Sequence, residues 1–370
     1  MLKSWLKRRA QSVPAPISIT ATQTFDGNDG PWSSFPISIG TPPQTVKILP
    51  STKGSQTWAV LPEGCIQSDP ANCTTARGGV YQPNSSSTWN QNQGASGGLF
   101  PLLLETNLDD TGNGLYGYDT VVLGGQGSSG PSLTQQVVAG IATKAFYLGV
   151  FGLSPNSVTL PDTNNQLPDY LSMLNQSNLI PSLSWSYTAG NQYRPGPAYG
   201  SLILGGLDAS RFQPNDITFP FNDTNTNLPD LVVNIGAIFL TTNGQSTTLQ
   251  SNNETIQAFV DSTTPYIYLP LNVCQQFEDA FGITWDTAVQ AYLVNETLHS
   301  NLSSSGTSIV FNLGNASTAP GQGFNISLPY SAFDLIAEAP LVKNASRYFP
   351  LMRAANASQI TLGRTFLQEA

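Results

Sequence analysis

Two short segments place a polar side chain directly after an apolar, strand-like run. Residues 259–263 read FVDST, so that Asp261 enters a tight turn at the end of such a run. Residues 48–52 read ILPST and have the same setting 210 residues earlier, with Ser51 in the place of Asp261. A carboxylate in this position can work as a general acid or base, whereas in a purely structural role it bonds nearby backbone amides. A serine hydroxyl is uncharged and does not take a proton from water near neutral or acidic pH.

The similarity of the two segments predicts two related lobes. Each half also contains a later apolar step that ends in glycine, VFG at residues 150–152 and TLG at residues 361–363. A pattern that occurs twice in the same order indicates a repeated unit. The sequence therefore predicts an N-terminal tail or propeptide remnant at residues 1–16, an N-terminal β lobe at 17–195, and a C-terminal β lobe at 196–370 that is truncated at its end.

The composition favours short strands joined by turns over long helices. Charged residues make up 10% of the chain, which contains 33 Gly and 27 Pro, and glycine and proline punctuate β structure. The strongest helix pattern covers residues 271–281, where Asn272 can cap the start and Gly282 the end. Shorter helices are expected at residues 170–174 and 331–337, and strands at residues 35–39, 46–49, 57–60, 120–123, 201–204, 256–260 and 266–269.

Five motifs follow one another along the chain from Phe35 onward. They are ISIGTPPQ at residues 37–44, YGYDTV at 116–121, GVFGL at 149–153, SLILGGLD at 201–208 and DSTT at 261–264. In this order and spacing they resemble the pepsin family of aspartic peptidases. The residues of the motifs look most similar to those of fungal members. The resemblance implies an all-β, bilobal, pepsin-like acid-protease fold with a few short helices. It also implies a cleft between the lobes that takes a peptide or protein ligand.

Active members of that family use one Asp from each lobe. Two carboxylates held close together cannot both ionise, so they share one proton and titrate as a coupled pair. The ionised member removes a proton from a bound water, and the protonated member hydrogen-bonds the scissile carbonyl. A Gly after each Asp-Thr pair lets the backbone approach the carboxylates closely.

Both motifs of this chain depart from the family's Asp-Thr-Gly pattern. Trp58 aligns the first motif, because active members carry a Trp seven residues after the first catalytic Asp, and this puts Ser51 at the catalytic position. In the second lobe Asp261 is retained. The family's Gly is replaced by Lys53 in the first motif and by Thr263 in the second. The resemblance thus gives Asp261 and Ser51 as the two catalytic positions, and the following residues as candidates to line the cleft: Thr52, Lys53, Gly54, Ser262, Thr263 and Thr264.

These departures predict a homologue with an incomplete catalytic pair. We expect it to be inactive or impaired as an endopeptidase and to keep a peptide-binding cleft, with no second carboxyl to share a proton with Asp261. The expected flap at residues 97–114 also lacks the Tyr that closes over substrate in active members. Two alternatives stay open: an aspartic endopeptidase active at acidic pH with an unrecognised acid, and a binding or inhibitor protein that acts on another secreted enzyme.

The tripeptide DTG occurs at residues 110–112, but in a different setting. It follows Asp109 rather than an apolar strand, and Asn113 and Gly114 come after it. Such residues are typical of a hairpin tip. We therefore expect Asp110 to lie in a turn rather than to be a catalytic residue.

Sequons and cysteines favour the secretory pathway, with an extracellular or cell-surface destination. Cys65 and Cys73 lie eight positions apart and are expected to form a disulfide rather than to remain as thiols, which leaves Cys274 without a partner. The start has no recognisable signal peptide, and its basic run at residues 7–9 resembles a processing site. The eleven Asn-x-Ser/Thr sequons are at Asn72, Asn84, Asn175, Asn222, Asn253, Asn295, Asn301, Asn315, Asn325, Asn344 and Asn356.

Charge and composition exclude several kinds of partner. The net charge of −9, with 14 Lys and Arg spread thinly, argues against nucleic acid. No stretch reaches the ~20 apolar residues needed to cross a bilayer, although a membrane tail beyond residue 370 is compatible with the sequence. One histidine, His299, and the lack of a Cys/His cluster indicate neither a Ser-His-Asp triad nor a metal site. We expect a monomer without cofactor or metal.

Overall fold

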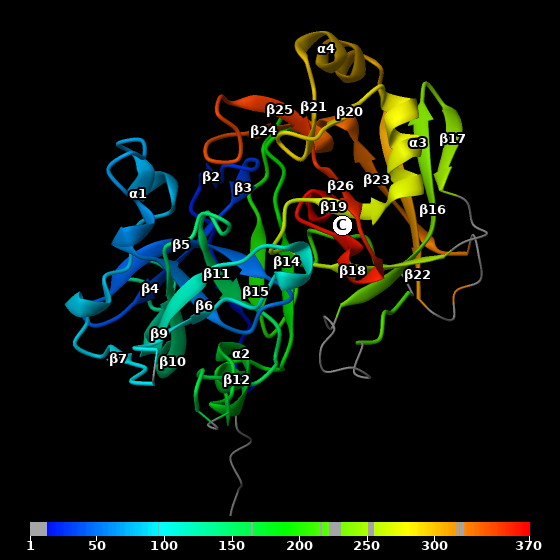
Figure 1. The fold of residues 1–370 in the computed structure, drawn as a ribbon. Helices are drawn as coiled ribbons and strands as arrows, with labels where there is room; N and C mark the ends of the chain where they lie inside the picture. The colour runs from blue at the N-terminus through cyan, green and yellow to red at the C-terminus, as the bar shows by residue number, and fades with distance from the viewer. Residues whose placement is uncertain are drawn as a thin grey trace, which may run out of the picture.

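Two large β-sheets form the body of the protein, one from the blue-to-teal strands and the other from the green-to-red strands (Figure 1). The computed structural model describes residues 13–370 except 95, 164–165, 215–216, 222–230, 251–254, 316–317 and 319–321. Most of the predicted tail at residues 1–16 therefore lies outside the described residues. The predicted all-β architecture with few short helices is confirmed.

The first sheet is built from residues of the first half of the chain. Its strands, in spatial order, are β10 (Ser132–Ile141), β6 (Thr57–Val60), β11 (Gly149–Gly152), β5 (Gln44–Ser51), β4 (Phe35–Ile39), β9 (Asn113–Leu123) and β7 (Asn90–Gln91), and β8 (Leu99–Pro101) also pairs with β9.

The second sheet repeats this plan with residues of the second half. Its strands, in spatial order, are β23 (Phe324–Pro329), β22 (Ser308–Gly314), β16 (Val232–Thr242), β18 (Ile256–Val260), β27 (Thr361–Leu362), β19 (Ile267–Pro270) and β26 (Leu351–Ala354), and β17 (Gln245–Gln250) pairs with β16.

Smaller sheets complete the β structure. A three-stranded sheet joins β1 (Ile17–Ile19), β15 (Ser201–Leu204) and β14 (Trp185–Thr188), so the predicted lobe boundary at 195 falls between two paired strands. The exact boundary stays a prediction. The remaining pairings are β2 (Phe25–Asp26) with β3 (Trp32–Ser33), β12 (Val158–Thr159) with β13 (Gln166–Leu167), and the series β20 (Thr284–Asp286), β21 (Ala291–Leu293), β25 (Ser346–Phe349), β24 (Leu335–Ala337).

The repeated sequence pattern corresponds to a repeated arrangement of strands. In the first sheet β11 pairs parallel with β5 and antiparallel with β6. In the second sheet β27 pairs parallel with β18 and antiparallel with β19. Each apolar step that ends in glycine therefore lies between the strand before a motif and the strand after it. Strands β11 and β27 thus fix the loops that carry Ser51 and Asp261.

The helices are short, and one of the three predictions is wrong. Helix α3 (Leu271–Phe281) has the predicted bounds and ends at Gly282, whose φ of 67° is left-handed, but Pro270 rather than Asn272 holds the N-cap position. Helix α2 (Tyr170–Gln176) confirms the second prediction. The other α-helices are α1 (Cys73–Ala76) and α4 (Glu296–Ser304).

The helix predicted at residues 331–337 does not form. A 3-10 helix, η4 (Tyr330–Phe333), is followed by strand β24, which pairs with β25. Leu335 and Ala337 are buried while Ile336 between them is partly exposed. This alternation suits a strand, and it outweighs the local helix pattern because the neighbouring strand supplies the hydrogen bonds.

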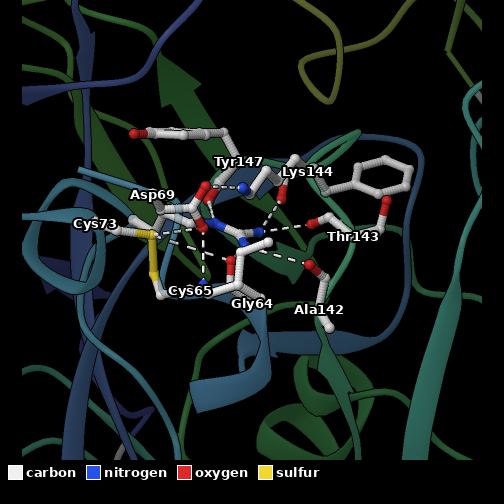
Figure 2. Close-up of a disulfide and its surroundings, with 11 residues drawn as sticks. Gly64, Cys65, Asp69, Cys73, Ala142, Thr143, Lys144 and Tyr147 are labelled. Carbon is white, nitrogen blue, oxygen red and sulfur yellow. Dashed lines mark hydrogen bonds and ion pairs between the residues drawn. A yellow bond between two sulfur atoms is a disulfide. The ribbon is translucent and has the colours of Figure 1, made fainter. Parts of the chain in front are cut away.

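A disulfide closes the loop before α1, as predicted. Cys65 and Cys73 are bonded with a Cα–Cα distance of 5.8 Å, and Figure 2 shows their surroundings. The guanidinium of Arg77, which is fully buried, donates hydrogen bonds to backbone carbonyls of this loop and of a second loop, at Gly64, Ala142, Thr143, Phe146 and Tyr147. The disulfide loop is thus tied to the segment that precedes β11.

Cys274 is the free cysteine among the described residues and lies buried on α3. Burial raises the pKa of its thiol to about 12. Because the thiolate is the reactive form of cysteine, this thiol is expected to be inert.

Replacing Cys65 by Ser should destabilise the fold by about 2–3 kcal/mol, because an eight-residue separation of the cysteines corresponds to a small closed loop. Urea unfolding of both proteins measures this difference. Reductant should lower the stability of the wild type by the same amount and leave the variant unchanged; a loss well below 1 kcal/mol would contradict the assignment of a stabilising role.

Candidate active site

The two motif loops meet at the centre of the molecule. Strand β5 ends at Ser51, and Asp261 follows the last residue of β18. Ser51 is fully buried and Asp261 is 1% exposed. The structure therefore brings together the two positions that the sequence comparison paired.

The second residue of each motif bonds the opposite loop. The Thr52 backbone N–H donates to Ser262 Oγ at 2.9 Å, and the Ser262 N–H donates to Thr52 Oγ1 at 3.0 Å. Each hydroxyl also donates to a carbonyl across the junction, Ser262 Oγ to Pro50 at 2.7 Å and Thr52 Oγ1 to Val260 at 3.0 Å. These four hydrogen bonds, three of them buried, fix the two loops relative to each other.

The third residue of each motif reaches across to the first residue of the other. Thr263 Oγ1 lies 2.6 Å from Ser51 Oγ, and Lys53 Nζ lies 3.6 Å from Asp261 Oδ2. The resemblance noted in the sequence would put glycine at both of these positions. The side chains of Thr263 and Lys53 occupy the space between the two motif loops.

Backbone amides complete the contacts of the two catalytic positions. The Gly54 N–H donates to Ser51 Oγ at 2.8 Å, and the Thr263 N–H donates to Asp261 Oδ1 at 2.9 Å. A Cβ on Gly54 would lie 2.9 Å from Ser51 Oγ, so this position cannot carry a side chain without a shift. Thr264, the remaining predicted cleft residue, is buried and lines a cavity beside Ser51.

A second carboxyl that the sequence analysis did not identify lies at this site. Glu105 Oε2 is 2.8 Å from Lys53 Nζ, and the side chain is 1% exposed. Burial, the charge of Asp261 and a hydrogen bond with Asp261 raise the pKa of Glu105 well above its usual value, against the opposing effect of Lys53. The expectation that Asp261 has no carboxyl with which to share a proton is therefore wrong.

The physical reason is that Glu105 comes from a distant hairpin. Strands β8 and β9 pair as a hairpin whose tip, residues 102–112, carries Glu105. The sequence signal was a single Glu within an apolar run, LLLET at residues 102–106. A charged group in such a run is often directed at a buried partner.

The hairpin tip is bonded to both halves of the molecule. Asn107 Oδ1 accepts a hydrogen bond from Lys53 Nζ at 2.8 Å. Asn107 Nδ2 donates to the carbonyl of Ser358 at 2.8 Å, and the Asn107 carbonyl accepts from Gln359 Nε2 at 2.7 Å. Ser358 and Gln359 belong to a 3-10 helix of the second half, η5 (Ala357–Gln359).

The tip packs against the first motif loop. Leu104 lies directly over Gly54, where a Cβ would lie 3.2 Å from its side chain. One cavity, of about 440 Å³, has a lining that includes Lys53, Gly54, Trp58 and Tyr116. A smaller cavity, of about 120 Å³, has a lining that includes Ser51, Asp110, Thr263 and Thr264.

The DTG segment lies in the hairpin tip, as predicted for a turn. Asp109, just before it, adopts a left-handed φ of 66°. Burial, together with the charges of Asp29 and Asp109, raises the pKa of Asp110 to about 6. Asp110 lies beside Ser51 in the smaller cavity, but nothing places it as the partner of Asp261.

No group of three His, Cys, Asp or Glu side chains that could hold a metal occurs among the described residues. Within the same part of the chain, no helix has the length and apolar character that crossing a bilayer requires. Of the eleven sequons, Asn222 and Asn253 lie outside the described residues, and Asn315 is half-buried. The Asn residues of the others are exposed: Asn72, Asn84, Asn175, Asn295, Asn301, Asn325, Asn344 and Asn356.

Replacing Thr52 by Val should destabilise the fold by about 2–4 kcal/mol, because it leaves the buried Ser262 N–H without an acceptor and removes the donor to the Val260 carbonyl. Urea unfolding measures the loss. The matched change at the exposed Thr134 should stay within about 0.5 kcal/mol of the wild type. Equal effects of the two changes would contradict the role assigned to Thr52.

Comparison with known proteins places these observations in a family. The family model described as eukaryotic aspartyl protease matches residues 34–370. Secreted aspartic protease 8 of Candida albicans is 26% identical over 353 residues, which cover 94% of this chain and 74% of that protein. Gastricsin of Callithrix jacchus is 27% identical over 263 residues, 70% of this chain and 60% of the relative.

A solved structure has the same fold. The crystal structure of an aspartic proteinase from Irpex lacteus superposes with a TM-score of 0.59 at 18% identity, over 96% of this chain and 92% of the other. The bilobal pepsin-like fold expected from the sequence is thereby confirmed. With nearly all of its length matched by the family model, the chain belongs to the eukaryotic aspartyl protease family.

Proposed function

We propose that this protein does not hydrolyse peptide bonds by the mechanism of its family, and that it binds a peptide or protein ligand in the cleft between its lobes. The observation that carries the proposal is the contact of Ser51 with Thr263, 2.6 Å between hydroxyl oxygens. The family's reaction needs a carboxylate at the position of Ser51 to share a proton with Asp261. Two hydroxyl groups cannot supply that acid.

Lys53 adds a second obstacle to the family's chemistry. Its ammonium lies 3.6 Å from Asp261 and 2.8 Å from Glu105. The ammonium contacts both carboxyls, so in the closed arrangement they are bonded to Lys53 rather than to a water and a scissile carbonyl, as the family's mechanism requires. Lys53 also fills space in which a water would have to be activated.

Glu105 does not restore the missing acid in this proposal. It is carried by the hairpin tip, and the tip must rise before a peptide can cross the cleft. Lifting the tip moves Glu105 away from Asp261. The two carboxyls therefore meet when the cleft is closed and separate when a ligand enters.

A second candidate function is an active endopeptidase that uses Asp261 with Glu105. The observation in its favour is the raised pKa of Glu105 beside Asp261, since a shared proton is what an aspartic pair requires. This candidate requires substrate to bind while the tip remains down. It ranks second because Leu104 and Gly54 are in contact across the path of the peptide.

We infer that the protein is a secreted glycoprotein. The support is the printed description of its Candida albicans relatives as secreted, the disulfide and the exposed sequons. A ligand outside the cell could be a peptide, a cell-wall component or another secreted enzyme. Purification of the protein from a secreting host tests both the location and the glycans.

The purified wild type should cleave a denatured protein no faster than its Asp261→Asn variant between about pH 3 and pH 6, the range in which carboxyl pairs of this kind work. A transition-state-mimicking inhibitor of aspartic peptidases should have no effect. Cleavage that is lost in both Asp261→Asn and Glu105→Gln would instead establish the second candidate function.

The combined change Ser51→Asp, Lys53→Gly and Thr263→Gly restores the family pattern and should raise cleavage by roughly 10³-fold or more, as expected when a concerted site is completed. The matched control adds Asp261→Asn to the same three changes and should abolish the gain. If the restored protein folds and binds the inhibitor but still cleaves nothing, the missing carboxyl is not the reason why the wild type lacks peptidase activity.

A further inference from the structure

The hairpin tip is held down by a small network centred on Lys53. The ammonium contacts Glu105 Oε2 and Asn107 Oδ1, each at 2.8 Å, and both of these residues belong to the tip. The third contact of the ammonium, to Asp261 at 3.6 Å, comes from the second lobe. Lys53 thus joins the hairpin tip to the second lobe.

The charges of this network do not balance when every group is ionised. One ammonium faces two carboxyls, and all three side chains are largely buried, with 14%, 1% and 2% of the Lys53, Glu105 and Asp261 side chains exposed. A buried, uncompensated charge is costly. The network is neutral only when one proton is held between Glu105 and Asp261.

The lack of a hydrogen-bond partner for one buried oxygen agrees with this count of charges. Glu105 Oε1 receives no hydrogen bond from any donor group among the described residues. A buried carboxylate oxygen normally has such a partner. A protonated Glu105 would not carry a buried, unpaired negative charge on this oxygen.

We propose that the hairpin tip is a gate, and that loss of the proton shared by Glu105 and Asp261 opens it. The cleft is then closed at acidic pH and admits ligand more readily near neutral pH. The proposal rests on the proposed function, because it concerns the same cleft and treats Glu105 as a closing group rather than a catalytic one.

The direction of the effect follows from proton linkage. In the closed state the pKa of Glu105 is raised by burial and by Asp261, whereas in an open, hydrated tip it returns toward its ordinary value. The closed state therefore binds this proton more tightly than the open state. The resulting stabilisation of the closed state relative to the open state is fully present below the ordinary pKa of Glu, and it is lost as the pH rises through the raised pKa.

Other titratable groups face the network, and one of them needs a control. Asp109 and Asp110 lie on the same tip, and Tyr268 of β19 is close enough for Glu105 to contribute to its raised pKa. Tyr268 stays neutral throughout the relevant range. Asp110, with a pKa of about 6, would itself favour opening on ionisation, so its contribution must be removed.

The test measures amide hydrogen exchange of the whole chain, corrected for intrinsic rates, in an Asp110→Asn background. Tip amides with backbone partners, such as those of Leu102 and Leu108, report the gate, and amides of β10 report global stability. Between about pH 5 and pH 8 the protection of the tip should fall about tenfold or more, which corresponds to one unit of linked pKa shift. Protection of β10 should change far less.

Adding Glu105→Gln should make protection of the tip independent of pH, because one ammonium then faces one carboxyl. Asp261→Asn should do the same by removing the other carboxyl, and it serves if the first variant does not fold. Protection of the tip that stays flat in the Asp110→Asn background, or that falls equally after either change, overturns the gate. Peptide cleavage is measured separately, so that cleavage would refute the proposed function while flat protection would refute only the gate.

Discussion

The interaction on which the site depends is the contact of one lysine ammonium with groups from two other parts of the chain. Lys53 comes from the first motif loop, Glu105 and Asn107 from the hairpin tip, and Asp261 from the second motif loop. Buried ion pairs contribute little net stability, but losing one partner leaves an uncompensated charge and is strongly destabilising. Each member therefore constrains the others, and the closed cleft follows from that constraint.

The fold tolerates this site because its framework is separate from its chemistry. The four hydrogen bonds between Thr52 and Ser262 and their neighbouring carbonyls join the lobes without using the side chain of Ser51 or Asp261. The strands β11 and β27 brace the two loops from behind. The side chains of Ser51, Lys53 and Thr263 lie between the two loops, whose positions this framework holds.

Local patterns in the sequence were enough to predict much of the fold and the setting of the two motif loops. The setting of Ser51 and Asp261, the bounds of α3 and the disulfide each depend on residues close together in the chain, or on a repeat that is visible by eye. Glu105 was missed because its partner Lys53 is 52 residues away and the loop between them gives no sign of direction. The segment at 331–337 was misassigned because its strand partner β25 follows it and supplies hydrogen bonds that a local pattern does not contain.

The most direct test of the account is a titration of the Glu105 carboxyl group by ¹³C NMR in the intact protein. The account predicts that Glu105 keeps its proton well above the usual range for Glu, and that amides of the hairpin tip lose protection over the same pH range. In the Lys53→Met variant the Glu105 step should move to higher pH, because the ammonium that lowers its pKa is removed. Titration of Glu105 at an ordinary value would contradict the claim that a buried proton and one lysine hold this cleft shut.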